Sequence, residues 1–190
     1  MVPAPAHNRP FLLVSGIPGS GKTTLAHRLG AALDMPVFDK DDILERLFET
    51  KGTGDAAWRR ALSRESDEIL VSEAEASSGA VLVSFWRLPG MAPHSGTPMG
   101  WLDSLDGRVA NVHCVCDPAV AARRFLQRKR HPGHLDGEQS YLKVVASFRK
   151  LARLAPPEIR TRVCVDTSQE LNITNLVREV RLFLHPKVKA

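Results

Sequence analysis

The sequence predicts an α/β fold, a three-layer sandwich in which a five-stranded parallel sheet has helices on both faces. Short apolar runs alternate with longer segments of helical periodicity along the 190 residues, which is typical of a parallel sheet covered on both sides. Polar residues that could take part in binding or catalysis directly follow the predicted strands. Ligands of parallel sheets bind at that edge. The chain length suits one domain with a full core.

Each element has a local reason. The first strand is a short apolar run before a Gly-rich stretch, and leucines recur at every fourth position in the helix that follows. Asp117 and Pro118 suit a helix start, as N-cap and first-turn proline. Strands are expected at residues 11–15, 37–38, 80–85, 108–115 and 162–165. Helices are expected at residues 22–33, 41–49, 56–77, 118–129, 138–154 and 173–184.

The ends of the chain and its hydropathy suggest a cytoplasmic protein. Residues 1–10 contain three prolines and lack the pattern of a signal peptide, so we expect a flexible lead-in before a single domain over residues 11–190. No apolar run approaches the roughly 20 residues that span a bilayer, so no membrane association is expected. Oligomeric state is not indicated.

Charge is distributed unevenly along the chain. Residues 123–162 contain eleven Lys or Arg against three Asp or Glu, whereas residues 39–78 contain eleven acids against six bases. A basic half of this kind fits nucleic acid, the phosphates of a nucleotide, or a solvated helix face. Charge alone does not separate these readings.

Residues 16–23 read Gly-Ile-Pro-Gly-Ser-Gly-Lys-Thr and match G-x-x-x-x-G-K-[ST], a P-loop, between a strand and a helix. Glycines let the backbone N–H groups approach phosphate oxygens, and the helix N-terminus adds its positive dipole end. We expect Lys22 to reach the β- and γ-phosphates and the Thr23 hydroxyl to face Mg²⁺. The residues predicted to bind nucleotide here are Gly16, Pro18, Gly19, Ser20, Gly21, Lys22, Thr23 and Thr24.

Two classes of P-loop protein are disfavoured. A small GTPase would carry a guanine-reading Asn-Lys-x-Asp, which the sequence lacks. A mechanical ATPase would carry a carboxylate at the end of its third strand, where this chain has Val83. The acids follow the second strand instead.

Three motifs together resemble the P-loop kinases: residues 16–23, the string Asp39-Lys40-Asp41-Asp42, and the Arg-rich stretch after Asp117-Pro118. The chain is similar to the branch that contains chloramphenicol phosphotransferase, shikimate and gluconate kinases, zeta toxins and the kinase domain of polynucleotide kinase. The resemblance implies a P-loop NTPase core, a mobile lid at about residues 128–137, and transfer of the γ-phosphoryl group of ATP to a hydroxyl with Mg²⁺ as cofactor.

In this branch an Asp after the second strand takes the proton of the acceptor hydroxyl. Asp41 matches that position best, and Asp39 is the other candidate for the base. Asp39 also matches a residue that helps to hold the metal through water. A carboxylate here would both orient the hydroxyl and accept its proton. The alternative for Asp41 is a helix N-cap, since a helical segment follows at once.

The resemblance also assigns lid arginines to the transferring phosphoryl group. The candidates are Arg124, Arg128 and Arg130, and Arg124 and Arg128 would share one helix face. Guanidinium groups suit the charge spread over phosphoryl oxygens. The alternative is a solvated basic helix.

The acceptor side is less specific. Trp86 and Arg87 follow the third strand, where Trp86 could stack on a sugar or flat ring and Arg87 could pair with an anion. The alternative for Trp86 is an aromatic side chain packed under a loop. Residues 94–97 are small and polar enough to line a pocket. Thr167 and Ser168 follow the fifth strand, near the place where similar kinases hold adenine. Capping of the last helix is the alternative for that pair.

Three functions remain open from the sequence. The first is an ATP-dependent kinase of a small hydroxyl-bearing molecule, such as a sugar, a nucleoside-like compound or an antibiotic. The second is a polynucleotide 5′-hydroxyl kinase, which the basic half favours and Leu44 disfavours, because those enzymes usually have Arg there. The third is a nucleotide-binding regulator without transferase activity.

Overall fold

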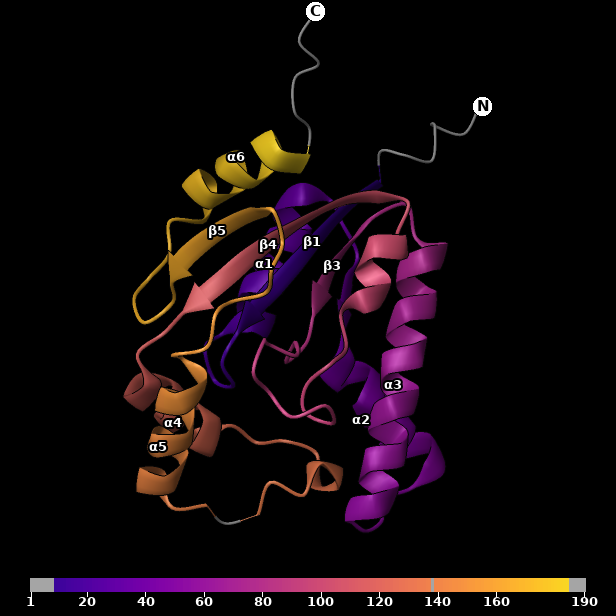
Figure 1. Ribbon diagram of the computed structural model, residues 1–190, viewed down its shortest axis with the longest axis vertical. Coiled ribbons are helices and arrows are strands. Elements are labelled where there is room, and N and C mark those ends of the chain that lie inside the picture. The colour runs from indigo at the N-terminus through magenta and orange to yellow at the C-terminus, as the bar shows by residue number, and fades with distance from the viewer. Residues whose placement is uncertain (1–8, 138, 185–190) are drawn as a thin grey trace, which may run out of the picture.

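The computed structural model describes residues 9–137 and 139–184, and Figure 1 shows the arrangement of its elements. Most of the expected flexible lead-in lies outside the described residues. The strands are β1 (Arg9–Gly16), β2 (Val37–Asp39), β3 (Ala80–Val83), β4 (Gly107–Val115) and β5 (Thr161–Asp166). The α-helices are α1 (Lys22–Leu33), α2 (Lys40–Lys51), α3 (Ala56–Ala76), α4 (Pro118–Gln127), α5 (Tyr141–Leu151) and α6 (Ile173–Leu184), with short 3₁₀ helices η2 (Gly100–Ser104) and η3 (Pro132–His134).

The five strands form one sheet in the order β2-β3-β1-β4-β5. Every neighbouring pair is parallel, and β1 lies in the middle, with Leu12 opposite Val81 of β3 and Ala110 of β4. This confirms the predicted five-stranded parallel sheet.

Two apolar layers hold helices against the sheet. Leu12 and Val14 of β1 pack with Leu25 and Leu29 of α1 and with residues of α6 on one face. Phe11 and Leu13, which alternate with them, face the opposite side and pack toward α3. Figure 1 shows α3 along one flank of the sheet and α6 near β5. The three-layer sandwich is therefore as predicted.

Several elements end earlier than the sequence suggested, among them β3, α4 and α5, the last of which stops at Leu151 rather than Leu154. β3 stops at Val83 rather than Phe85, and α4 stops at Gln127 rather than near Lys129. His131 precedes Pro132, and a residue before proline is forced toward extended backbone, so the helix must end before it. Arg128 is already extended, with φ −72° and ψ 137°.

The carboxyl ends of the strands meet at one edge of the sheet. The P-loop leaves β1 there, Asp39 ends β2, and Ser84 follows β3. In Figure 1 this edge faces α4 and α5 on one side and the ends of α2 and α3 on the other. Within the described ranges, no helix is both long enough and apolar enough to cross a membrane.

Candidate active site

The P-loop has the backbone that its glycines were expected to allow. Gly16, Gly19 and Gly21 have φ values of 141°, 74° and 84°, which side-chain-bearing residues rarely adopt. A Cβ on Gly19 would lie 2.2 Å from the carbonyl oxygen of Ala121 in α4. The loop is therefore packed against α4, and both the turn and this close approach require glycine.

Lys22 lies at the start of α1 and folds back over the loop. Its Nζ donates to the carbonyl oxygens of Gly16 (3.1 Å) and Ile17 (3.0 Å). Burial lowers the pKa of Lys22. The hydroxyl of Ser20 is buried with no hydrogen-bond partner among the described residues. An anion in the loop could accept hydrogen bonds from the Ser20 hydroxyl and from the Lys22 ammonium, so the cradle fits a phosphate chain.

Asp39 connects α1, the helix that follows the P-loop, to α2. Its Oδ2 accepts a hydrogen bond from the Thr23 hydroxyl (2.7 Å), and its Oδ1 accepts from the Asp41 backbone N–H (2.9 Å). Asp39 is thus the N-cap of α2, which corrects the alternative that Asp41 might be the cap. Burial raises the pKa of Asp39 to about 6.

The two side chains predicted to serve the metal are brought together by this contact. A hydroxyl and a carboxylate suit a hard cation such as Mg²⁺, which keeps several waters and bonds to substrate phosphates. No cluster of three or more His, Cys, Asp or Glu that could hold a metal occurs in the part of the chain that the structure describes. Thr23 and Asp39 therefore fit a metal that is held mainly by nucleotide and water.

Asp41 projects from the first turn of α2 toward the lid segment. Its Oδ2 accepts from Arg130 (2.6 Å), and Arg130 also pairs with Asp136 (2.9 Å). Burial alone would raise the pKa of Asp41, but the charges of Arg130 and other nearby basic side chains outweigh it and lower the pKa. Asp41 is therefore ionised at neutral pH. Within the described ranges, no donor contacts its Oδ1.

The lid segment, residues 128–137, leaves α4 and packs against α2 (Figure 1). The buried ring of His134 pairs with Glu45 at 2.8 Å. His131 stacks on Phe48 at a centroid separation of 5.2 Å, and a Cβ on Gly133 would lie 2.6 Å from the same ring. The lid segment thus packs against the apolar ring of Phe48.

The three predicted lid arginines converge but have different partners. Arg124 donates to the carbonyl oxygen of Thr167 (2.8 Å), Arg130 is held by two carboxylates, and the guanidinium of Arg128 lies 4.7 Å from the Phe125 ring centre. Among the described residues, the Arg128 side chain forms neither an ion pair nor a hydrogen bond, whereas Arg124 and Arg130 form at least one. Arg128 is therefore the lid arginine that is free to meet an arriving anion.

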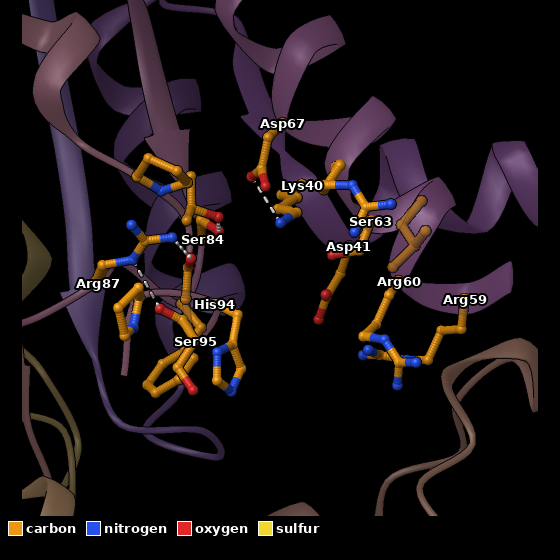
Figure 2. A pocket seen from close by; sticks show the side chains of 17 residues that line it. Lys40, Asp41, Arg59, Arg60, Ser63, Asp67, Ser84, Arg87, His94 and Ser95 are labelled. Atoms are coloured by element: carbon orange, nitrogen blue, oxygen red, sulfur yellow. Dashed lines mark hydrogen bonds and ion pairs between the residues drawn. The ribbon is translucent and has the colours of Figure 1, made fainter. Parts of the chain in front are cut away.

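Two pockets open at the carboxyl edge. The first, here called the cradle pocket, has a volume of about 520 Å³, and its lining includes Lys22, Thr23, Asp39, Asp41, Arg124 and Arg128. The second, here called the α3 pocket, has a volume of about 560 Å³, and its lining includes Lys40, Asp41, Arg59, Arg60, Arg64 and Arg87. Asp41, Arg59, Ser84 and Phe85 line both pockets. Figure 2 shows the α3 pocket, with Asp41 between the Arg87 side and the Arg59–Arg60 side.

Trp86 does not lie where the sequence analysis expected an acceptor-binding residue. The side chain is 1 % exposed, belongs to the core under α3, and donates through Nε1 to the carbonyl oxygen of Val14 (3.0 Å). Because β3 ends at Val83, Phe85 rather than Trp86 faces the pockets. Trp86 therefore supports the floor of the site and cannot stack on a ligand.

Arg87 does line the α3 pocket, together with residues 94–97, as expected. Its guanidinium donates to the carbonyl oxygens of Ser95 (3.0 Å) and Gly96 (3.4 Å). These bonds hold the loop in shape and leave Arg87 with fewer free donors than an unpaired arginine.

Thr167 and Ser168 use their hydroxyls inside the protein. The Thr167 hydroxyl donates to the Val115 carbonyl oxygen (3.0 Å), and the Ser168 hydroxyl accepts from the Asp117 N–H (3.0 Å). Both residues tie the end of β5 to the start of α4. Their predicted contact with adenine stays a prediction, and it would have to come through backbone groups.

Three arginines of α3 that line a pocket were not expected from the sequence: Arg59, Arg60 and Arg64. With Ser63 and Asp67 they recur at helical spacing on one face, which could have marked them. The signal was hidden because residues 39–78 are acidic on balance, and only the packing shows which face of α3 borders the pocket.

The fold and the cradle define a P-loop nucleotide-binding protein. A family model described as "AAA domain" matches residues 11–157. This covers more than half of the chain, and the chain belongs to that family.

Two curated relatives match over a shorter stretch. The shikimate kinase of Corynebacterium glutamicum is 36% identical over 73 residues, and that of Corynebacterium jeikeium is 37% identical over 73 residues. The match covers 38% of this chain in both cases, and 43% and 40% of the relatives. The matched stretch thus spans less than half the length of these relatives.

Solved structures resemble the whole fold at low identity. A protein from Chloroflexus aurantiacus is 22% identical with a TM-score of 0.74, over 93% of this chain and 98% of that one. The shikimate kinase of Acinetobacter baumannii is 18% identical with a TM-score of 0.58, over 97% and 100% of the two chains. A gluconokinase from Sinorhizobium meliloti is 17% identical with a TM-score of 0.51, over 94% and 93%. Together with the family match, these likenesses confirm the predicted resemblance to the P-loop kinases.

Replacing Trp86 with Phe tests its structural placement. The change removes the indole N–H and leaves the Val14 carbonyl oxygen without that donor, so we expect a loss of about 1–3 kcal/mol in the free energy of unfolding. Urea unfolding measures the loss. A variant of parental stability with selectively weakened ligand binding would contradict the core placement and restore a direct role in binding.

Proposed function

We propose that this protein transfers the γ-phosphoryl group of ATP to a hydroxyl group of a small molecule, with Asp41 as the general base. The observation that carries the proposal is that Asp41 lines both pockets. A base for this reaction must reach a hydroxyl on one side while the phosphoryl group lies on the other. A protein that only binds nucleotide needs no carboxylate there.

The cradle pocket supplies the groups that hold the donor. Backbone N–H groups of the loop and the Lys22 ammonium would contact the phosphates, which replaces the present bonds of Lys22 to Gly16 and Ile17. Thr23 would coordinate Mg²⁺ directly, and Asp39 would bind it through water. The metal would supply positive charge that offsets the negative charge developing on the phosphate oxygens.

The transfer step needs no covalent enzyme intermediate. The acceptor oxygen bonds to the γ-phosphorus, the bond from that phosphorus to the bridging oxygen breaks, and ADP leaves with the electron pair. The acceptor proton passes to Asp41 Oδ1, the oxygen that no donor contacts within the described ranges. Arg130 on Oδ2 fixes the carboxylate so that Oδ1 faces the acceptor.

The lid arginines would neutralise charge on the transferring group. Arg128 is unpaired and lines the cradle pocket, so it can contact the phosphoryl oxygens without breaking an existing ion pair. Arg124 is held in place by its hydrogen bond to the Thr167 carbonyl oxygen. The names of the matched relatives, shikimate kinase and gluconokinase, support a hydroxyl-bearing small molecule as acceptor rather than a polynucleotide.

Asp41→Asn separates catalysis from binding and folding. The amide keeps the size of the side chain but cannot accept the proton, so we expect transfer to fall by roughly 10²–10⁴. Affinity for ATP should stay near that of the parent, because Asp41 does not hold the nucleotide. The measurement is phosphorylation of the best acceptor, alongside nucleotide binding on the same preparation.

Asp42→Asn is the matched control. Asp42 is exposed, follows Asp41 directly, and lines neither pocket. The cap of α2 belongs to Asp39 and is intact in both variants. Equal activity of Asp41→Asn and Asp42→Asn would rule out Asp41 as the base.

Arg128→Ala tests the lid. We expect kcat to fall by more than KM for ATP rises, because the guanidinium acts on charge that develops in the transition state. Arg123→Ala removes the same charge from the neighbouring helix, but Arg123 is exposed and lines neither pocket. If the two variants behave alike, the basic stretch is a solvated face and not a catalytic lid.

A further inference from the structure

The α3 pocket has more positive charge than its own acids can balance. Five basic side chains and two acidic ones line it. The acids are already paired: Asp67 with Lys40 at 2.6 Å, and Asp41 with Arg130 at 2.6 Å. Lys40 is therefore neutralised within the pocket, whereas Asp41 is paired with an arginine that does not line it. The unbalanced positive charge of the pocket belongs to its arginines.

The side chains of three of these arginines form no hydrogen bond and no ion pair within the described part of the chain. They are Arg59, Arg60 and Arg64, which follow one face of α3. The Nε of Arg59 is buried without a hydrogen-bond partner, which is costly for a charged group unless something else supplies one. In Figure 2 the guanidinium groups of Arg59 and Arg60 converge at the side of the pocket that also holds Asp41.

The one other arginine of α2 and α3 is different. Arg46, on the outer side of α2, pairs with Glu73 at 3.1 Å. The helix pair therefore has carboxylates available for ion pairs, yet none of them forms an ion pair with Arg59, Arg60 or Arg64 among the described residues. Arginines that face a pocket without ion-pair partners are suited to bind an anionic group of a ligand.

We propose that the acceptor is an already phosphorylated alcohol, whose phosphate monoester dianion binds to Arg59, Arg60 and Arg64 while its free hydroxyl lies at Asp41. The inference rests on the proposed function and names the chemical class of its acceptor. The product would carry two phosphate groups, one on each of two oxygens of the same molecule.

Charge favours a dianion over a monoanion here. At the same distance, two negative charges gain twice the Coulomb energy of one, and three phosphate oxygens can accept from several guanidinium groups at once. A single carboxylate would leave most of these α3 arginines unpaired. Arg59 lines both pockets, so it would contact the acceptor phosphate near the point of transfer.

The first test measures binding without turnover. The protein is saturated with Mg²⁺ and a non-hydrolysable ATP analogue, so that the cradle pocket is filled. Thermal unfolding is then followed at pH 8 with methyl phosphate or acetate, at matched ionic strength. We expect methyl phosphate to raise Tm above the value in acetate. Equal Tm values in the two anions would overturn the proposal.

Variants identify the site. Arg60→Ala/Arg64→Ala should weaken apparent binding of methyl phosphate by about tenfold or more, the scale of one lost charge-assisted contact. Arg149→Ala/Lys150→Ala removes the same charge from exposed positions of α5 and should leave binding unchanged. Equal loss in both double variants would show a general charge effect and contradict the site.

A second set of probes tests the acceptor class on one carbon skeleton. Glucose 6-phosphate, glucuronate and glucose carry two, one and no negative charges, and we expect stabilisation to fall in that order. A 5′-hydroxyl oligonucleotide that stabilises the protein more than any phosphate monoester would contradict the proposal in favour of a nucleic-acid acceptor. If phosphate binds but no acceptor consumes ATP, the proposed function fails and the binding site stands. If ATP is consumed only with neutral or monoanionic acceptors, this inference alone fails.

Discussion

The carboxylate of Asp39 is the contact on which the rest of the site depends. One of its oxygens accepts from the Thr23 hydroxyl at the start of α1, and the other accepts from the Asp41 N–H at the start of α2. At 4 % exposure it is nearly buried between them, so the link is shielded from water. It fixes two helix starts relative to each other, and with them the P-loop on one side and Asp41 on the other. This side chain therefore helps to set the distance between the P-loop and Asp41.

A second set of contacts brings the lid to the same place. Arg130 reaches Asp41, while the His134–Glu45 pair and the Phe48 ring hold the following residues against α2. Helix α2 therefore begins at Asp39, which is proposed to serve the metal, carries the proposed base Asp41, and provides Phe48, against which the lid segment packs. Movement of the lid segment would change the charge around Asp41 directly, because Arg130 is a principal cause of the lowered pKa of that residue.

The sequence predicted the parts of this arrangement that depend on local pattern. The strands and helices follow apolar periodicity, the P-loop is a contiguous motif, and Asp39 and Asp41 were expected at the carboxyl edge because they follow a strand. Which of the two caps α2 depends on side-chain geometry, and the structure assigns the cap to Asp39. Trp86 was misplaced because the packing of the residues after β3 decides which side chain reaches the pockets: Phe85 lines them, whereas Trp86 enters the core. The arginines of α3 recur at helical spacing, but only long-range packing shows that their face of the helix borders a pocket.

The most direct test of the central claim, phosphoryl transfer to a small molecule, is ³¹P NMR of reactions that contain ATP, Mg²⁺ and one candidate acceptor each. The candidates are phosphorylated and free sugars, nucleosides, antibiotics and 5′-hydroxyl oligonucleotides. We expect ADP and a new phosphate ester to appear in equal amounts with a small molecule, and we expect Lys22→Ala, which removes the charge that serves the phosphates, to abolish both while keeping the fold. Formation of ADP with free phosphate only, or an unchanged rate in the Lys22→Ala variant, would contradict the central claim.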